Sequence, residues 1–278
     1  MIPPIARRFV AGESASTALD HVADLNRNGV GGILNLLGEH YETREAAEED
    51  VEQYLDLLSR LERTELTASV SIKPSQIGLD AGEDVFVDNL GRILAAADDS
   101  DVFVWIDMED YTTTDVTLDA YSQFASQYGG DVGLCVQANL KRTSDDLERL
   151  AELPGKIRLV KGAYDEPESV AYQDKQRVNE VYRENLEYMF QTFDSGIAVG
   201  SHDPAMIEYA KELQEQYKTD FEVQMLMGVR TDAQYELAKE GYEVNQYLPY
   251  GDKWASYFYR RVRERKENLL FAARAVLS

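Results

Sequence analysis

The sequence predicts an α/β fold, a (β/α)8 TIM-like barrel with an extra N-terminal helix. Short β-branched or apolar runs alternate with longer amphipathic stretches about eight times from near residue 30 onward, which is the alternation that such a barrel requires. A doubly wound sheet usually has fewer strands and a glycine-rich turn after the first, but no GxGxxG motif follows a strand here. Since no low-complexity linker or shift in composition interrupts the chain, residues 1–278 are expected to form a single barrel domain.

Each expected element rests on its own residue pattern. The extra helix spans 16–26 and is followed by a turn, Gly29-Val-Gly-Gly32, which lacks the third glycine of a dinucleotide-binding motif. Apolar or β-branched runs predict strands at 31–38, 66–72, 102–108, 132–138, 157–160, 196–200, 221–227 and 243–248. Amphipathic spacing predicts helices at 48–61, 86–97, 118–127, 144–153, 171–193, 204–217, 232–240 and 254–276. Any dinucleotide must then be held by barrel loops.

The chain is strongly acidic, with 51 Asp and Glu against 28 Lys and Arg and a formal net charge of -23. Such a surface repels phosphate backbones, so nucleic acid is not an expected partner. Concentrated salt shortens the Debye length to about 3 Å at 1 M and would relieve the self-repulsion. We therefore hypothesise a halophilic protein, the alternative being an acidic mesophilic one. Full stability and activity without added salt would contradict this hypothesis.

Other sequence features bear on the compartment and on metals. The chain has no run of 18 apolar residues and no apolar secretory signal near its start, so it is expected to be soluble and cytoplasmic. The single cysteine, Cys135, lies in an apolar run and is interpreted as a small core residue, which excludes an internal disulfide. The three histidines, His21, His40 and His202, lack metal-ligand spacing, and no metal is expected.

Polar residues gather where the expected strands end, which is the edge at which barrel enzymes carry their active sites. Four of the candidate site residues at these ends are Tyr164, Ser201, His202 and Tyr247. Alternation with period two places four pairs on common faces directed toward the barrel interior: Ser71 with Lys73, Asp107 with Glu109, Gln137 with Asn139, and Gln224 with Leu226. The same alternation cannot direct both Arg158 and Lys161 inward, so one of them acts from a bend at the end of its strand.

Several of these residues have other interpretations. Lys73 and Asp107 could form a barrel-closing ion pair without a role in binding, because buried charges are usually paired. Lys161 could be the Schiff-base lysine of a barrel aldolase if Arg158 lies near and lowers its pKa. His202 could be a core histidine whose hydrogen bonds are satisfied. Outside enzymes, the alternative is a small-molecule sensor that binds an anion without turnover.

The last expected helix carries a cluster of arginines in the run Tyr257-Phe-Tyr-Arg-Arg-Val-Arg-Glu-Arg265. Successive helical residues diverge by about 100°, so Arg260 and Arg261 can converge on one anion, while Glu264 lies one turn beyond Arg260. Two guanidinium groups suit a carboxylate, with charge-assisted bonds of roughly 1.5–3 kcal/mol each. Arg263 and Arg265 are assigned to the solvated face of the helix.

Taken together, the strand ends and this helix resemble the proline dehydrogenase, or proline oxidase, family. The match runs from about Lys73 to Glu264, and its strongest pieces are Arg158-Leu-Val-Lys-Gly-Ala-Tyr164 and Tyr247-Leu-Pro-Tyr-Gly251 with the arginine pair. The resemblance implies a monofunctional enzyme that binds FAD without a Rossmann motif and oxidises L-proline to Δ1-pyrroline-5-carboxylate. Where many family members have Trp-Asp after the tyrosine, this chain has Asp165-Glu166.

The resemblance implies two sets of site residues. For the substrate, Arg260 and Arg261 would clamp the proline carboxylate, and Glu264 would hold the arginine pair. Lys73 would be a further cation near that group, and Asp107 would be an orienting acid. Tyr164 would be an aromatic residue beside the pocket, and Tyr247 and Leu226 would pack on the proline ring.

For the cofactor, Arg158 matches an arginine near flavin N5 and Gln137 matches a glutamine that contacts the isoalloxazine ring. The rest of the implied flavin site is Lys161, Gly162, Ala163, Ser201 and His202.

The hypothesis for the mechanism is hydride transfer from proline C5 to flavin N5, with the protein supplying position and charge. The resemblance also implies a quinone-type electron acceptor, reached by peripheral contact with the inner face of the membrane. A closer alternative is the oxidation of hydroxyproline or another cyclic imino acid, which would depend on the room beside Tyr247 and Tyr257. The aldolase that uses Lys161 would need no flavin.

Overall fold

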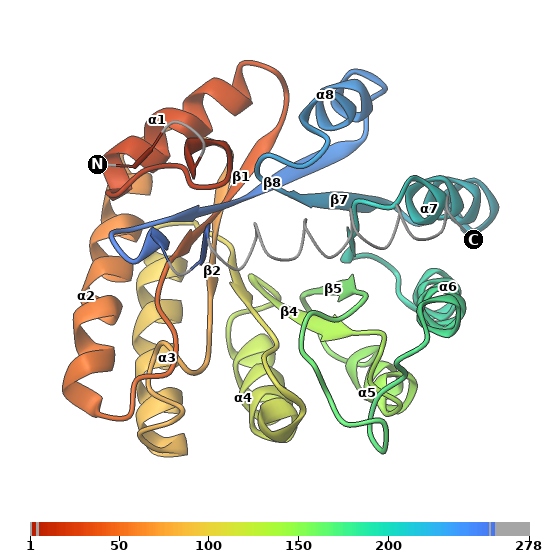
Figure 1. Ribbon diagram of the computed structural model, residues 1–278, viewed down its shortest axis with the longest axis horizontal. Coiled ribbons are helices and arrows are strands. Elements are labelled where there is room, and N and C mark those ends of the chain that lie inside the picture. The colour runs from red at the N-terminus through yellow and green to blue at the C-terminus, as the bar shows by residue number, and fades with distance from the viewer. Residues whose placement is uncertain (1, 4–5, 256, 259–278) are drawn as a thin grey trace, which may run out of the picture.

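The computed structural model describes residues 2–3, 6–255 and 257–258. Eight parallel strands form one closed barrel in chain order, and β8 pairs with β1 to complete it (Figure 1). The strands are β1 (Gly31–Leu36), β2 (Ala68–Ile72), β3 (Val104–Ile106), β4 (Val132–Gln137), β5 (Lys156–Val160), β6 (Ile197–Gly200), β7 (Phe221–Leu226) and β8 (Glu243–Tyr250). The predicted (β/α)8 barrel is confirmed.

The helices surround the barrel, and the extra N-terminal helix is present as α1 (Figure 1). They are α1 (Ala15–Asn26), α2 (Arg44–Leu61), α3 (Glu83–Asp99), α4 (Thr114–Gln127), α5 (Thr143–Leu150), α6 (Lys175–Thr192), α7 (Pro204–Tyr217) and α8 (Thr231–Lys239). Two short 3-10 helices, η1 (Ala6–Arg8) and η2 (Tyr111–Thr113), complete the described elements. Within the described residues, no helix is both long and apolar enough to cross a membrane.

Capping side chains explain two of the helix starts that differ from the predicted ones. Helix α2 begins four residues before the predicted position 48, because the Thr43 side chain caps it and accepts a hydrogen bond from the backbone N–H of Ala46 at 3.3 Å. Helix α6 begins at Lys175 instead of 171, because Asp174 is its N-cap. Of the predicted helix 254–276, positions 254–255 and 257–258 are helical, and the rest lies outside the described residues.

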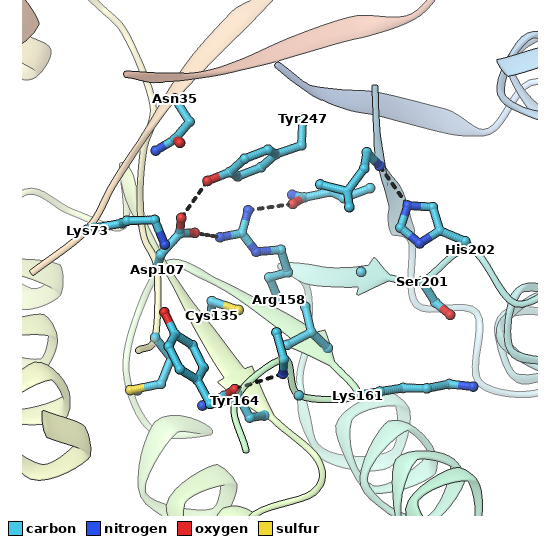
Figure 2. A pocket seen from close by; sticks show the side chains of 18 of the residues that line it. Asn35, Lys73, Asp107, Cys135, Arg158, Lys161, Tyr164, Ser201, His202 and Tyr247 are labelled. Atoms are coloured by element: carbon cyan, nitrogen blue, oxygen red, sulfur yellow. Dashed lines mark hydrogen bonds and ion pairs between the residues drawn. The ribbon is translucent and has the colours of Figure 1, made fainter. Parts of the chain in front are cut away.

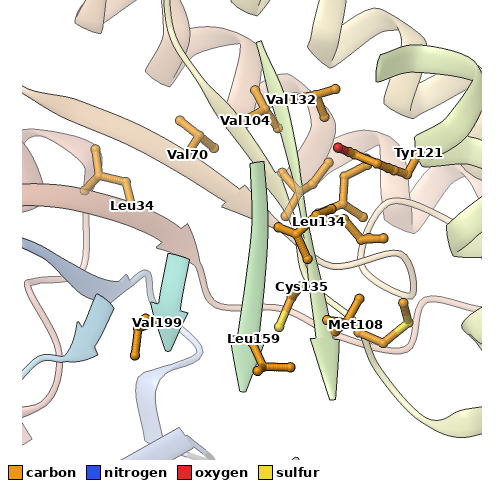
Figure 3. Packing of buried hydrophobic residues seen from close by; sticks show 14 of the residues in the cluster. Leu34, Val70, Val104, Met108, Tyr121, Val132, Leu134, Cys135, Leu159 and Val199 are labelled. Carbon is orange, nitrogen blue, oxygen red and sulfur yellow. The ribbon is translucent and has the colours of Figure 1, made fainter. Parts of the chain in front are cut away.

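The main apolar core lies between the outer face of the barrel and the helices. Its side chains come from the strand positions that point outward, together with the apolar faces of the helices (Figure 3). Leu34, Val70, Val104, Leu134 and Leu159 are fully buried there. Burial of each such side chain contributes roughly 1.5–3 kcal/mol, so this layer stabilises the barrel without using the strand positions that point inward.

The barrel interior is filled differently. A small apolar cluster of Ile33, Trp105 and Ala198 packs with Phe103 and Tyr247. Branched aliphatic residues dominate the interior of most such barrels, but here charged and polar side chains share the interior with that cluster. The buried residues of this kind just beyond β3 and on β5 and β7 are Asp107, Arg158, Glu222 and Gln224. Buried charges cost free energy unless they are paired. The partners of these side chains therefore help to locate the candidate active site.

Candidate active site

The polar strand ends surround a cavity of about 1130 Å³ at the C-terminal end of the barrel (Figure 2). Every site residue implied by the family resemblance that falls within the described part of the chain lines it. These residues are Lys73, Asp107, Gln137, Arg158, Lys161, Gly162, Ala163, Tyr164, Ser201, His202, Leu226 and Tyr247. Arg260, Arg261 and Glu264 lie outside the described residues. The barrel therefore brings together positions that are up to 174 residues apart, from Lys73 to Tyr247.

Asp107, just beyond β3, accepts hydrogen bonds from three directions. Ser71 Oγ donates to Oδ1 at 2.8 Å, and the Arg158 guanidinium forms an ion pair with the same oxygen. The Tyr247 hydroxyl donates to Oδ2 at 2.6 Å. Burial raises the pKa of Tyr247 well above its ordinary value, and the charge of Asp107 adds to this effect. Tyr247 therefore stays a neutral hydrogen-bond donor to Asp107.

Arg158 points into the barrel from β5 and is only 4% exposed. Its Nη1 donates to Oε1 of Gln224 at 3.0 Å. Its guanidinium carbon lies 5.0 Å from the centre of the Trp105 ring and 5.7 Å from that of Tyr247, within the range of cation–π attraction. Burial opposes the charge of Arg158, but its anionic partners, Asp107 among them, outweigh burial and hold its pKa above the ordinary value. The cavity thus contains a permanent, positioned positive charge.

Lys73 and Tyr164 lie on the same side of the cavity (Figure 2), and with Glu109 they form a second set of interacting titratable residues. Burial raises the pKa of Tyr164 to about 12, although the charge of Lys73 opposes the rise. Burial also opposes the charge of Lys73, yet Tyr164 and nearby carboxylates raise its pKa. Glu109 is buried, and its carboxylate accepts hydrogen bonds from Ser75 N at 2.7 Å and Ser75 Oγ at 2.8 Å. Lys73 is therefore a cation in the part of the site where a carboxylate ligand was expected.

Lys161 follows β5 and is directed away from Arg158 (Figure 2). Its ammonium lies 2.7 Å from Oδ2 of Asp203 and 2.6 Å from Oδ1 of Asn179. Gly162, the next residue, has a φ of +112°, which favours glycine and turns the chain at the end of the strand. Of the two cations that could not both point inward, Arg158 is therefore the inward one and Lys161 acts from the bend.

Gln137, Ser201 and His202 extend the cavity wall. Gln137 Nε2 donates to the backbone carbonyl of Glu109 at 2.8 Å, while its Oε1 accepts from the backbone N–H of Ala163 at 3.4 Å. His202 Nε2 accepts from the backbone N–H of Leu226 at 2.8 Å, so this nitrogen carries no proton in the observed arrangement.

The contacts decide among the alternatives that the sequence left open. Among the described residues, the carboxylate of Asp107 pairs with Arg158, so the Lys73–Asp107 ion pair was a wrong alternative. The aldolase required a desolvated Lys161 near Arg158, whereas Lys161 is half-buried and paired with Asp203. No cluster of potential metal ligands occurs in the described part of the chain.

Sequence reasoning missed several lining residues. Asn35, Tyr41 and Lys253 come from the ends of β1 and β8 or from the loops that follow, and Gln224 was noted only for its face. Cys135, interpreted as a core residue, is buried in the apolar core as expected but also lines the cavity. Burial raises the pKa of its thiol. The period-two pattern could have found Cys135, since it shares a face with Gln137.

Comparison with known proteins gives a consistent result. A family model described as "Proline dehydrogenase" matches residues 18–274. The chain is 39% identical over 282 residues to the proline dehydrogenase of Deinococcus radiodurans, and this match covers 98% of this chain and 90% of that protein. It is 37% identical over 275 residues to proline dehydrogenase 1 of Bacillus subtilis, with the same coverage of each.

Among solved structures, the fold resembles proline utilization A (PutA) of Bdellovibrio bacteriovorus inactivated by N-propargylglycine, with a TM-score of 0.83 and 22% identity over 92% of this chain. It also resembles a mutant PutA of Bradyrhizobium japonicum, with a TM-score of 0.74 and 20% identity over 92% of this chain. The chain spans 32% and 30% of those longer proteins. At these identities, the likeness establishes the fold.

Proposed function

This chain belongs to the proline dehydrogenase family, and from that premise we propose that it oxidises L-proline to Δ1-pyrroline-5-carboxylate with FAD as its bound cofactor. The observation that carries the proposal is that the described residues assigned by the family resemblance, far apart in sequence, line one cavity around the buried Arg158. Proline dehydrogenases are the curated relatives that the chain matches over nearly its whole length.

The cavity fits FAD by its size and by its donors. Its volume of about 1130 Å³ exceeds the range of roughly 300–1,000 Å³ that is usual for one small ligand, so a dinucleotide and an amino acid have room together. The wall between β5 and β6 is built from small residues, Gly162, Ala163, Gly200 and Ser201. A Cβ at Gly200 would lie 2.7 Å from Cγ1 of Val160 and 3.2 Å from Cγ of Arg158. A larger residue there would therefore displace Val160 and press on the stem of Arg158.

The residues proposed to hold FAD are Gln137, Arg158, Lys161, Gly162, Ala163, Ser201 and His202. When bound, the flavin supplies at N5 an acceptor for the hydride that leaves C5 of proline. Arg158 contributes a fixed positive charge that favours the negative charge of the reduced cofactor. Asp107 keeps that guanidinium in place. A preorganised charge of this kind costs no reorganisation during the reaction.

On the substrate side, Tyr247 and Leu226 are proposed to pack against the proline ring, with Tyr164 beside them and Lys73 as a cation for the carboxylate. The hydrogen bond from Tyr247 to Asp107 fixes the phenol ring. It therefore gives the substrate a rigid wall. Asp107 joins the two halves of the proposed site, because the same carboxylate holds Arg158 and Tyr247.

The carboxylate clamp is proposed to consist of Arg260 and Arg261, with Glu264 holding the pair. Replacing either arginine, in Arg260→Ala or Arg261→Ala, is expected to raise KM for proline at least about tenfold while FAD stays bound, because charge-assisted bonds to the carboxylate are lost. Steady-state kinetics and the ratio of flavin to protein absorbance measure both effects. Arg263→Ala, in the same run of arginines but assigned to the solvated face, is the matched control. An unchanged KM in both clamp variants would remove the assignment.

We further propose a single-domain cytoplasmic enzyme that passes its electrons to a quinone by peripheral contact with the inner face of the membrane. The free buried Cys135 is compatible with a reducing compartment. The net charge of -23 motivates the proposal that it is adapted to high salt.

The melting temperature is therefore expected to rise with NaCl concentration up to at least about 1 M, where the Debye length has fallen to about 3 Å. Thermal unfolding followed by circular dichroism checks this, with sucrose as the uncharged control. A melting temperature that is the same without salt would contradict the halophilic adaptation.

The proposed function is tested by an absorbance spectrum of the purified protein in high salt, recorded before and after anaerobic addition of L-proline. Bleaching of a flavin band is the expected result. Hydroxyproline is compared in parallel, and faster bleaching by it would reassign the substrate. A protein that binds no flavin after reconstitution with FAD would contradict the proposal.

A further inference from the structure

A continuous series of polar contacts runs through the barrel interior from its N-terminal end toward the cavity. At the start of β5, Lys156 Nζ lies 2.9 Å from Oε2 of Glu222 on β7. The other oxygen of Glu222 accepts a hydrogen bond from Nε2 of Gln224. Gln224 Oε1 in turn accepts from Arg158 Nη1 at 3.0 Å. Arg158 thus has two anchors, Asp107 near the cavity and the Gln224–Glu222 pair on the opposite side.

The orientation of the Gln224 amide is dictated by its neighbours. A guanidinium has only donors, so it requires the amide oxygen, and a carboxylate has only acceptors, so it requires the amide nitrogen. Both requirements are met together while Glu222 is ionised. A protonated Glu222, or a glutamine at this position, can instead donate to Gln224 Oε1 and compete with Arg158 for that oxygen. The carboxylate of Glu222 therefore selects the amide orientation that Arg158 needs.

We propose that Glu222 is a positioning residue for Arg158, acting through the amide of Gln224. Glu222 is only 4% exposed and lines no part of the cavity that has been described, so it acts through Gln224 and not on the ligand. The inference rests on the proposed function, because its consequence for catalysis requires that Arg158 serve the flavin.

The groups that face Glu222 make its charge sensitive to pH. They are Gln224 on β7, Lys156 on β5, and Glu243 and Asn245 on β8. Burial and, to a smaller extent, Glu243 raise the pKa of Glu222 to about 7 against the opposing charge of Lys156. Because the pKa is raised, the carboxylate is present above about pH 7 and is lost as the pH falls through that value. Below it, the competition for Gln224 Oε1 is expected to loosen Arg158.

The test compares four flavin-loaded variants of the full chain, Glu222→Gln, Gln224→Met, their double variant, and Glu243→Gln. The control is Glu243→Gln. Glu243 is another carboxylate near Lys156, with its Oε1 3.7 Å from the Lys156 ammonium, but it does not hydrogen-bond to the Gln224 amide and so does not orient it. Anaerobic mixing with proline gives the limiting rate of flavin reduction and its pH profile. The dissociation constant of FAD, read from flavin fluorescence without proline, gives a second measure that is independent of turnover.

Glu222→Gln and Gln224→Met are each expected to lower the limiting rate about tenfold and to weaken FAD binding. Because both act through one contact, the double variant should be no slower than Gln224→Met alone. The wild type should lose rate as the pH falls through about 7. Glu222→Gln and Gln224→Met should lack this step. Glu243→Gln should keep it at a lower pH, because Glu243 contributes to raising the pKa of Glu222.

Additive effects in the double variant, or a Glu222→Gln protein with the wild-type rate and pH profile, would overturn the inference. If Glu222→Gln does not fold, the wild type and Gln224→Met decide the question by the presence and absence of the pH step. A wild-type flavin that proline does not bleach would contradict the proposed function instead, so the two failures are distinguishable.

Discussion

Arg158→Met is expected to lower the rate of proline-dependent flavin reduction at least about 100-fold, the loss usual when a preorganised charge is removed from an active site. It is also expected to lower the free energy of unfolding by about 3–5 kcal/mol, because removing one partner leaves the buried charge of its neighbour uncompensated. That neighbour is Asp107, whose remaining donors are the hydroxyls of Ser71 and Tyr247. Urea unfolding and anaerobic flavin reduction measure the two effects.

The double variant Asp107→Asn/Arg158→Met separates stability from chemistry. It removes the uncompensated carboxylate, so it is expected to recover at least about half of the lost stability. The rate should stay low, because the positive charge beside the proposed flavin site is still missing. An Arg158→Met protein that loses less than about 1 kcal/mol of stability and keeps its rate would contradict the assignment of Arg158 as a buried, positioned cation.

Local patterns were sufficient for most of the fold. Every strand was placed within two residues of its observed start and end, because parallel strands buried on both faces are continuous apolar runs and polar residues stop them. Helix starts were less accurate, and α2, α4 and α6 each begin four residues away from the predicted position. At α2 and α6 the boundary is set by the capping residues Thr43 and Asp174, which apolar spacing does not reveal. The positions of the chemical groups followed from the fold, since a closed parallel barrel brings all its strand ends to one edge.

Partnerships inside the barrel could not be predicted in the same way. The resemblance named Asp107 as an orienting acid but did not give Arg158 as its partner, and among the described residues its ion pair is with Arg158 on β5. The contacts of Lys156 and Arg158 with Glu222 and Gln224 cross between β5 and β7, which are not neighbours in the sheet. Alternation states which face a side chain occupies. It does not state which distant side chain it meets across the barrel, because that depends on the register of strands tens of residues apart.

Trp105→Ala is expected to have the second largest effect, a loss of about 3–5 kcal/mol in the free energy of unfolding. The Trp105 side chain is 2% exposed and packs inside the barrel with Phe103, whose ring centre lies 5.0 Å away. It also lies over the Arg158 guanidinium. The variant should therefore lose flavin-reduction rate as well as stability, since Arg158 loses its contact with the indole ring. Thermal and urea unfolding measure the first effect and anaerobic reduction the second.

A complementary change on the neighbouring strand tests whether packing causes the loss. Trp105 pairs in register with Gly133 of β4, and a Cβ at Gly133 would lie 2.6 Å from two atoms of the Trp105 ring. Gly133→Ala alone should therefore destabilise the wild type by about 1–3 kcal/mol through overpacking. In the Trp105→Ala background, the same methyl group enters the space that the indole vacated, and of the three nearest atoms only Phe103 Cε1, at 2.9 Å, remains. Gly133→Ala should therefore cost less there than in the wild type. Equal losses in the two backgrounds would instead mean that the cost of Gly133→Ala comes from Phe103 or the backbone of β4, and that the indole does not require glycine at this position.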